Sequence, residues 1–165
     1  MLYVGRGKGK TSACLGQVLR ALGHGLSVAM VQFIKRDGQA GEQKILKNLL
    51  QDRFRAGGLG FVRMASDLKP HREAACALLA FGLAQIEQVA ILILDEVLYA
   101  LEYALLSAAD IQAVLKKARS CGCHLILSGR LAPDWLYHEA DLVTMMQEVK
   151  HPHKLGQKAI LGLDF

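Results

Sequence analysis

Short apolar runs alternate along the chain with longer segments in which apolar residues recur every three or four positions. The short runs contain few polar residues, which is typical of strands covered on both faces by helices. We expect strands at residues 2–4, 26–33, 60–64, 89–96, 124–129 and 141–149. The helical periodicity predicts helices at 10–22, 41–50, 71–88 and 107–119, and a short helical turn at 134–138. This alternation predicts a three-layer α/β/α fold with a mostly parallel sheet.

Two predicted helices carry capping signals. Gly23 follows the last apolar residue of the first helix and is a candidate C-cap. The helix that begins at Ser107 has Asp110 three residues later, which gives an approximate capping box. The polar stretch 34–44 is the best candidate for a mobile loop, because it contains two glycines and no apolar anchor after Ile34.

Length and composition point to one domain. The chain has 165 residues, of which 52% are hydrophobic, enough for a substantial core in a single domain over residues 1–165. No apolar run reaches the roughly 18 residues of a membrane span. The first residues do not form the basic and apolar regions of a signal peptide. We therefore expect a cytoplasmic protein that does not bind membranes.

Charge and cysteine content narrow the function only slightly. The net charge of +5 fits either nucleic acid or a small polyanion. Aromatic residues make up 6% of the chain, which argues against base stacking and so against a nucleic-acid partner. None of the four cysteines forms a C-x-x-C pair, and Cys121 and Cys123 have the wrong spacing for the common zinc motifs. We expect reduced, partly buried thiols.

The stretch "LYVGRGKGKTSACLG" near the start of the chain has the composition of a phosphate-binding loop between a strand and a helix. Gly5, Gly7 and Gly9 allow backbone N–H groups to approach an anion. Lys10 is suited to bind the β- and γ-phosphates, and Thr11 to offer its hydroxyl to Mg²⁺. Only three residues separate Gly5 from Gly9, where the usual loop has four. An ordinary glycine-rich turn is therefore the alternative.

Two further predicted strands end in polar residues. The strand "ILILDE" ends at Asp95 and Glu96, and P-loop proteins hold Mg²⁺ with an aspartate at this place. The next strand ends in "LSGR", which puts Ser128 and Arg130 at the carboxyl edge of a parallel sheet, where ligands bind. Arg130 is suited to clamp a phosphate. Each feature alone also fits a solvated strand end, but together they predict a nucleotide site.

These motifs together resemble the P-loop corrinoid adenosyltransferases of the CobA/BtuR type. That family has a shortened loop of the form G-x-G-K-G-K-T-T, matched here by "GRGKGKTS". The segments "RALGHG", "VQFIK", "LDEVLYAL" and "SGRLAPDWLYHEADLVTMMQEVKHPHKLGQKA" are also similar to family segments. The likeness covers nearly the whole chain. It implies a RecA-like P-loop NTPase fold and identifies the short loop as the family's own form.

The resemblance implies a reaction as well as a fold. The family transfers the 5′-deoxyadenosyl group of ATP to the Co(I) of a reduced corrinoid and releases triphosphate. The nucleophile belongs to the corrinoid, so the protein needs no activated side chain. ATP, with Mg²⁺, is then the co-substrate and the corrinoid is the substrate. A flavoprotein reductase and a homodimer are carried over from the family and cannot be read from these residues.

Site residues follow from the motifs and the resemblance. We expect Lys10, Glu96 and Arg130 to be catalytic, by stabilising the charge on the leaving triphosphate. We expect Thr11, Asp95 and Glu96 to bind Mg²⁺, directly or through its waters. The residues expected to bind the nucleotide or the corrinoid are Gly5, Arg6, Gly7, Lys8, Gly9, Lys10, Thr11, Ser12, Arg130 and Lys150.

Two departures from the family concern the corrinoid side. Only four residues precede Gly5, so we expect either a truncated chain or one without the N-terminal helix that helps to cover the corrinoid in some members. The family also carries an aromatic-rich loop, near G-F-T-W, that helps to displace the lower axial ligand of cobalt. We matched it to residues 63–74, which have no aromatic ring other than His71. His71 is either a substitute or an ordinary residue in the first turn of a helix.

Two other functions stay open at this stage. A RecA-like ATPase would use Glu96 to orient water and would release ADP and phosphate. A non-catalytic relative would bind ATP or a corrinoid without turnover. The two histidines in "KHPHK" at residues 150–154 allow a metal site, but no acid or thiol lies at ligand spacing, which favours a solvated or corrinoid-facing loop.

Overall fold

A computed structural model describes residues 1–62, 64, 68–151 and 156–163. Strands and helices alternate along this part of the chain, as the hydrophobic pattern predicts. In chain order the elements are β1 (Leu2–Val4), α1 (Lys10–Gly23), β2 (Val28–Gln32), α2 (Gly41–Leu50), the 3₁₀ turn η1 (Gln51–Arg53), β3 (Phe54–Ala56), α3 (Leu68–Gln85), β4 (Ile91–Asp95), α4 (Val97–Glu102), α5 (Ala108–Ser120), β5 (His124–Ser128), α6 (Asp134–Glu139) and β6 (Val143–Met145).

The described strands form one six-stranded sheet in the order β3-β2-β4-β5-β1-β6. Every strand pairing in it is parallel. Gln32 lies opposite Asp95, and Tyr3 opposite Ser128. The carboxyl ends of the central strands therefore meet at one edge. The predicted α/β/α fold is confirmed, with an entirely parallel sheet where we expected a mostly parallel one.

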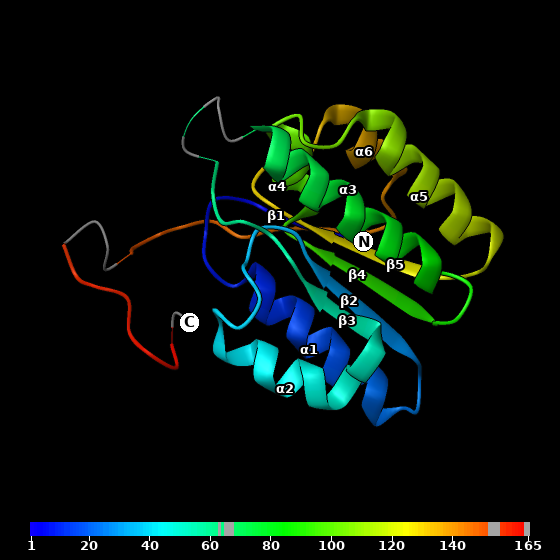
Figure 1. Cartoon of the computed structure of the whole chain (residues 1–165), viewed down its shortest axis with the longest axis horizontal. Helices are drawn as coiled ribbons and strands as arrows, with labels where there is room; N and C mark the ends of the chain where they lie inside the picture. The colour runs from blue at the N-terminus through cyan, green and yellow to red at the C-terminus, as the bar shows by residue number, and fades with distance from the viewer. Residues whose placement is uncertain (63, 65–67, 152–155, 164–165) are drawn as a thin grey trace.

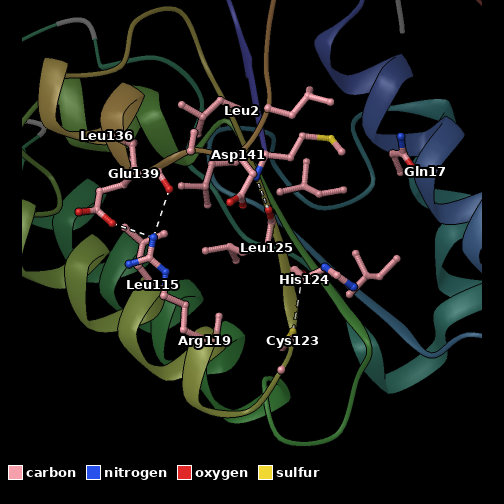
Figure 2. A pocket seen from close by; sticks show the side chains of 18 residues that line it. Leu2, Gln17, Leu115, Arg119, Cys123, His124, Leu125, Leu136, Glu139 and Asp141 are labelled. Atoms are coloured by element: carbon pink, nitrogen blue, oxygen red, sulfur yellow. Dashed lines mark hydrogen bonds and ion pairs between the residues drawn. The ribbon is translucent and has the colours of Figure 1, made fainter.

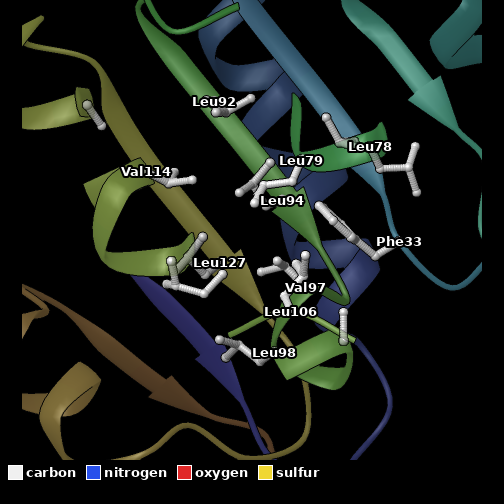
Figure 3. Packing of buried hydrophobic residues seen from close by; sticks show 14 of the residues in the cluster. Phe33, Leu78, Leu79, Leu92, Leu94, Val97, Leu98, Leu106, Val114 and Leu127 are labelled. Carbon is white, nitrogen blue, oxygen red and sulfur yellow. The ribbon is translucent and has the colours of Figure 1, made fainter. Parts of the chain in front are cut away.

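Helices cover both faces of the sheet (Figure 1). Helices α1 and α2 pack on one face, and α3, α4 and α5 on the other. Within the central strands β2 and β4, successive residues enter the two core clusters in turn. Met30 and Ile93 pack toward α1, whereas Val31 and Leu94 pack toward α3 and α5 (Figure 3). This double burial explains why the strand sequences are continuously apolar.

The third strand is not where the sequence pattern predicts it. The expected strand at 60–64 is wrong, because β3 spans Phe54–Ala56 and residues 57–62 and 64, between β3 and α3, are irregular. A Cβ atom on Gly58 would lie 2.4 Å from the carbonyl oxygen of Phe33, so only glycine allows this close approach. The amide of Gly60 also donates to the carbonyl of Ile34 at 2.8 Å. The chain here crosses the loop after β2.

Two helix ends test the capping predictions. Gly23 is the last residue of α1 and His24 is the C-cap, so the predicted C-cap is wrong by one residue, and the left-handed residue that follows is Gly25 (φ 71°). Ser107 is confirmed as the N-cap of α5. Its hydroxyl accepts from the Asp110 amide at 3.2 Å, and the Asp110 carboxylate accepts from the Ser107 amide at 2.8 Å.

Helix α4 follows β4 after one residue and was not predicted. It packs directly over the end of β5, where a Cβ atom on Gly129 would lie 2.5 Å from Cβ of Leu98. Among the residues that the structure describes, no helix combines the length and the apolar character needed to cross a membrane. Cys14 and Cys123 are buried, Cys76 and Cys121 are exposed, and all four are free thiols, as expected.

Candidate functional site

The glycine-rich loop joins β1 to α1, which is the context expected of a phosphate-binding loop. Gly5 (φ 114°) and Gly9 (φ 112°) have backbone conformations that favour glycine. The Lys10 ammonium folds back over the loop and donates to the carbonyl oxygens of Gly5 and Gly7, both at 2.7 Å. Burial lowers the pKa of Lys10, while the nearby Glu96 carboxylate opposes that shift.

Gly5 and Gly7 have a second, structural reason to be glycine. The chain after β6 passes directly over the loop. Cβ atoms on Gly5 and Gly7 would lie 2.3 and 2.7 Å from the Met146 carbonyl oxygen. The Gly7 amide donates to that same carbonyl at 2.9 Å. This contact joins residues far apart in the sequence, so the sequence pattern could not predict it.

Asp95 is the centre of a buried hydrogen-bond network at the carboxyl edge. Its side chain is fully buried and accepts hydrogen bonds from Thr11 (3.0 Å), Ser128 (2.7 Å) and Gln32 (3.2 Å). The Ser128 hydroxyl in turn accepts from the Glu96 amide at 2.8 Å. The network therefore fixes the Asp95 carboxylate against the first turn of α1.

Glu96 lies next to Asp95 in a different environment. Its backbone is left-handed (φ 64°), and it caps the start of α4. Burial, and then the negative charge of Asp95, raise the pKa of Glu96 to about 7. One carboxylate oxygen, Oε2, is buried without a hydrogen-bond partner among the described residues. A buried oxygen of this kind can accept a bond from a ligand or a hydrated cation.

Sequence reasoning did not single out Lys35 as a site residue. Its ammonium donates to Glu42 Oε1 at 2.9 Å and to Thr11 Oγ1 at 3.0 Å, and it lies 3.7 Å from Asp95 Oδ2. Burial by itself lowers the pKa of Lys35, but the charges of Asp95, Glu96 and Glu42 outweigh it and raise the pKa. A lysine three residues after a central strand, at the ligand-binding edge, was the available signal.

An aromatic cluster of Phe61, Tyr99 and Tyr103, with Arg130 against it, lies beside the glycine-rich loop. The Phe61 and Tyr99 rings meet edge to face at 5.2 Å, and Tyr99 stacks on Tyr103 at 4.3 Å. The Arg130 guanidinium lies 5.7 Å from the centre of the Tyr99 ring, and the Arg130 carbonyl accepts from the Gly5 amide at 2.9 Å. Phe61 is 54% exposed.

Phe61 corrects one expectation from the sequence. Because β3 ends at Ala56, the loop before α3 begins at residue 57 and contains "GGLGFV". The expectation that this loop has no aromatic ring other than His71 is therefore wrong. His71 itself lies in the first turn of α3, nearly buried, and lines a separate cavity with Phe61 and Arg36. Arg63 and residues 65–67 fall outside the described part of the chain.

A cavity of about 480 Å³ connects the loop with the acidic network. It is bordered by the C-terminal segment, where the Leu163 carbonyl accepts from the Lys8 ammonium at 2.6 Å. The lining residues are Lys8, Gly9, Lys10, Thr11, Ser12, Leu15, Lys35, Gly41, Glu42, Glu96, Gly162 and Leu163.

The expected site residues divide into two groups. The structure brings Lys8 to Ser12 and Glu96 together around this cavity, with Asp95 directly behind Thr11. Arg6 and Lys150 are exposed and do not line it, and Arg130 lies at the aromatic cluster.

The donor set suits Mg²⁺. A threonine hydroxyl and a buried carboxylate are hard oxygen ligands, which Mg²⁺ prefers, with water and phosphate completing its shell. No group of three or more His, Cys, Asp or Glu side chains within the described ranges could hold a metal by itself. His153 lies outside the described residues, so the "KHPHK" motif is not tested.

A second cavity, of about 620 Å³, lies at the opposite, amino-terminal ends of β1 and β5 (Figure 2). Leucine side chains line much of it, and an ion pair between Arg119 and Glu139 (2.7 Å) lies at its side. It is remote from Asp95, because the strands run the length of the sheet between the two places.

Comparison with known proteins gives one consistent family. The family model described as "ATP:corrinoid adenosyltransferase BtuR/CobO/CobP" matches residues 1–165. A corrinoid adenosyltransferase from Pseudomonas aeruginosa is 36% identical, and the match covers 100% of this chain and 82% of that protein. One from a Sinorhizobium species is 35% identical, with 79% of it covered. The corrinoid adenosyltransferase CobA of Salmonella typhimurium is 31% identical, with 84% covered.

Solved structures support the fold alone. The genome-packaging NTPase B204 of Sulfolobus turreted icosahedral virus 2, in complex with AMP, superimposes with a TM-score of 0.56 at 21% identity. The match covers 94% of this chain and 77% of that one. The RadB recombinase gives a TM-score of 0.52 at 14% identity, covering 92% and 76%. Both agree with the predicted P-loop NTPase fold.

Proposed function

Because this chain belongs to the ATP:corrinoid adenosyltransferase family, and so transfers the adenosyl group of ATP to a corrinoid, we propose that the cavity between the glycine-rich loop and Asp95 binds the triphosphate. The observation that carries this assignment is the buried contact of Thr11 with Asp95 at the end of that loop. A hydroxyl and a carboxylate held together beside a lysine-bearing loop form a site for a metal-bound polyphosphate.

The reaction places simple demands on the protein. The electron pair of Co(I) attacks the 5′ carbon of ATP and forms the Co–C bond. The C5′–O bond breaks, and triphosphate leaves with its electron pair. The protein must hold the 5′ carbon near the cobalt and stabilise the charge that grows on the leaving oxygen. Lys8 and Lys10, which line the cavity, are suited to that stabilisation.

Thr11 and Asp95, with Glu96 through water, are the residues proposed to hold Mg²⁺. The cation would neutralise part of the triphosphate charge when bound. Glu96 contributes a buried carboxylate oxygen beside Asp95 that has no hydrogen-bond partner within the described part of the chain. The remaining nucleotide contacts proposed for this cavity come from Gly9 and Ser12, which line it, whereas the Gly5 and Gly7 amides already donate to the Arg130 and Met146 carbonyls and Arg6 lies outside the cavity.

The corrinoid side of the proposal rests on the aromatic cluster. Phe61 meets Tyr99 edge to face and Tyr99 stacks on Tyr103, with the Arg130 guanidinium against the Tyr99 ring and the Arg130 carbonyl bonded to the Gly5 amide. Flat apolar rings suit a corrin macrocycle, and Arg130 and the exposed Lys150 suit its polar side chains or the phosphates. A flavoprotein reductase that supplies Co(I), and a homodimer, belong to this proposal by family resemblance alone.

Adenosyl transfer and its dependence on Lys10 test the proposal. Wild-type protein, ATP, Mg²⁺ and chemically reduced cob(I)alamin should give the absorbance spectrum of a Co–C-bonded corrinoid and release triphosphate. Lys10→Ala should weaken ATP binding about 10- to 100-fold, because each hydrogen bond to a charged group contributes about 1.5–3 kcal/mol. Calorimetry measures the affinity.

Lys47→Ala is the matched control, because Lys47 pairs with Asp37 on the exposed side of α2. Unchanged ATP affinity in Lys10→Ala would contradict the phosphate-loop assignment. Release of ADP and phosphate without a corrinoid would instead identify an ATPase, and ATP binding without any turnover a non-catalytic relative.

A further inference from the structure

We propose that Lys35 is a mobile cation of the nucleotide site, which holds the metal-binding oxygens together before Mg·ATP binds and then moves onto the triphosphate. The inference rests on the proposed function, because it assumes that the cavity beside Thr11 and Asp95 takes the triphosphate. It adds a residue and a conformational step to that site.

The first argument is the set of oxygens that the Lys35 ammonium contacts. Thr11 Oγ1 at 3.0 Å and Asp95 Oδ2 at 3.7 Å are the atoms assigned to Mg²⁺, and Glu42 Oε1 at 2.9 Å completes the group. These atoms come from α1, β4 and α2. The ammonium is therefore the positive charge that neutralises this acidic group in the structure.

The second argument is electrostatic. A Mg²⁺ ion bound to Thr11 and Asp95 would lie about 2.1 Å from their oxygens, and so within a few ångströms of the Lys35 ammonium. Two cations at that distance in a partly buried site repel each other strongly. Thr11 donates its hydroxyl proton to Asp95 and accepts from Lys35 with one of its two lone pairs, so a metal on the same oxygen would lie directly beside the ammonium. Metal and ammonium therefore compete for one place.

The third argument concerns which part of Lys35 can move. The backbone around it is fixed: the Phe33 amide donates to the Asp95 carbonyl at 3.0 Å, and the Gly58 amide to the Lys35 carbonyl at 3.1 Å. The side chain is 23% exposed and lines the same cavity as Lys8 and Lys10. Its four-carbon stem allows the ammonium to swing while the main chain stays in place.

The cavity offers the ammonium a new partner when it moves. Lys8, Lys10 and Lys35 border the same space of about 480 Å³, so a triphosphate held there lies within reach of all three. The ammonium then exchanges Thr11 and Asp95 for phosphate oxygens. In this arrangement the metal and the nucleotide together displace Lys35, and Lys35 adds to the charge that stabilises the leaving triphosphate.

Lys35→Met, which removes the charge and keeps most of the stem, separates the two roles. Mn²⁺ binding without nucleotide is measured by electron paramagnetic resonance, and binding of inorganic tripolyphosphate without metal by calorimetry. Lys35→Met should bind Mn²⁺ alone at least about tenfold more tightly than wild type, because the competing cation is gone. It should bind tripolyphosphate at least about tenfold more weakly.

Lys47→Met is the matched control and should change neither affinity, since Lys47 pairs with Asp37 on the exposed side of α2. Lys35→Arg retains the positive charge and should keep Mn²⁺ binding weak. If Lys35→Met does not give folded protein by circular dichroism, Lys35→Gln is measured in the same way.

Tighter Mn²⁺ binding together with weaker tripolyphosphate binding in Lys35→Met supports the proposal. Unchanged Mn²⁺ affinity, unchanged tripolyphosphate affinity, or a fall in both overturns it, because a purely structural lysine would not strengthen metal binding on removal. Neither measurement involves a corrinoid or adenosyl transfer. The proposal about Lys35 can therefore fail while wild-type protein still transfers adenosyl, and the two failures are distinguishable.

Discussion

Asp95 and Glu96 are adjacent carboxylates with different surroundings. Asp95 accepts hydrogen bonds from three side chains, which hold a carboxylate in one orientation. Glu96 is half-buried beside that charge, and its raised pKa of about 7 leaves it partly protonated near neutral pH. Two acids that look equivalent in "LDE" therefore differ in their hydrogen bonds and in their ionisation.

A substitution at Phe61 tests the proposed corrinoid site separately from the nucleotide site. Phe61→Ala should lower kcat/KM for the corrinoid at least about tenfold, which corresponds to about 1.4 kcal/mol, because the ring against Tyr99 is lost. ATP affinity and stability should change little, since Phe61 is 54% exposed and does not line the triphosphate cavity. Steady-state kinetics with varied corrinoid, and calorimetry with ATP, measure the two effects. A loss of ATP affinity would contradict the division of the site.

The helices around the sheet differ in what determines their boundaries. The capping box at the start of α5 depends on two side chains and could be predicted from their spacing alone. Helix α4 depends on its surroundings. Val97, Leu98 and Ala100 are fully buried, and Gly129 leaves room for the helix. A six-residue helix has too few turns to show a helical period, so only its packing stabilises it.

Ser107→Ala should destabilise the protein by about 1 kcal/mol at pH 7, because it removes the N-cap of α5. Hydrogen bonds from the Ser107 backbone and then its side chain lower the pKa of Asp110 below the ordinary 3.8. A depressed acid stabilises the fold above its unfolded pKa, and this contribution is lost as the pH falls through the folded pKa. The difference between variant and wild type should therefore shrink toward pH 3.

Urea unfolding at pH 7 and pH 3 measures this difference. Ser120→Ala is the control, because the Ser120 hydroxyl donates to the Lys117 carbonyl and contacts the Cys121 sulfur at the exposed end of the same helix, away from its N-cap. If both variants lost the same free energy of unfolding, the N-cap at Ser107 would not contribute specifically to stability.

For the molecule as a whole, the central strands carry the stability. Leu92 and Leu94 of β4 are fully buried against the helices that cover this face of the sheet (Figure 3). The same strand carries Asp95 at its end, so the core that stabilises the fold also fixes the site. A change in the packing of β4 should therefore affect both.

Leu94→Ala should lower the free energy of unfolding by about 2–5 kcal/mol, through lost burial and the cavity left behind. Chemical denaturation measures the change. Leu19→Ala, on the outer face of α1 where Leu19 is 60% exposed, should stay within about 0.5 kcal/mol of wild type. If the two variants were equally stable, the double-sided core would not be the main source of stability.

The layered fold and the phosphate-binding loop could be predicted from the amino-acid sequence alone. Both signals are local: continuous apolar runs mark strands covered on both faces, and glycines followed by Lys10 and Thr11 mark the loop. The same local signals failed at β3, where three residues with Arg55 exposed between two buried neighbours are too short to show a period.

The contacts that complete the site depend on how the elements pack. Strand order and loop direction bring Lys35 to Thr11 and Asp95, and place Phe61 against Tyr99. They also carry the chain after β6 over Gly5 and Gly7, so that packing also requires these glycines. Thr11 and Asp95 are 84 residues apart, and nothing in the local pattern of either encodes that contact. Periodicity reports which face of an element is buried, whereas contacts between elements depend on how the whole chain packs.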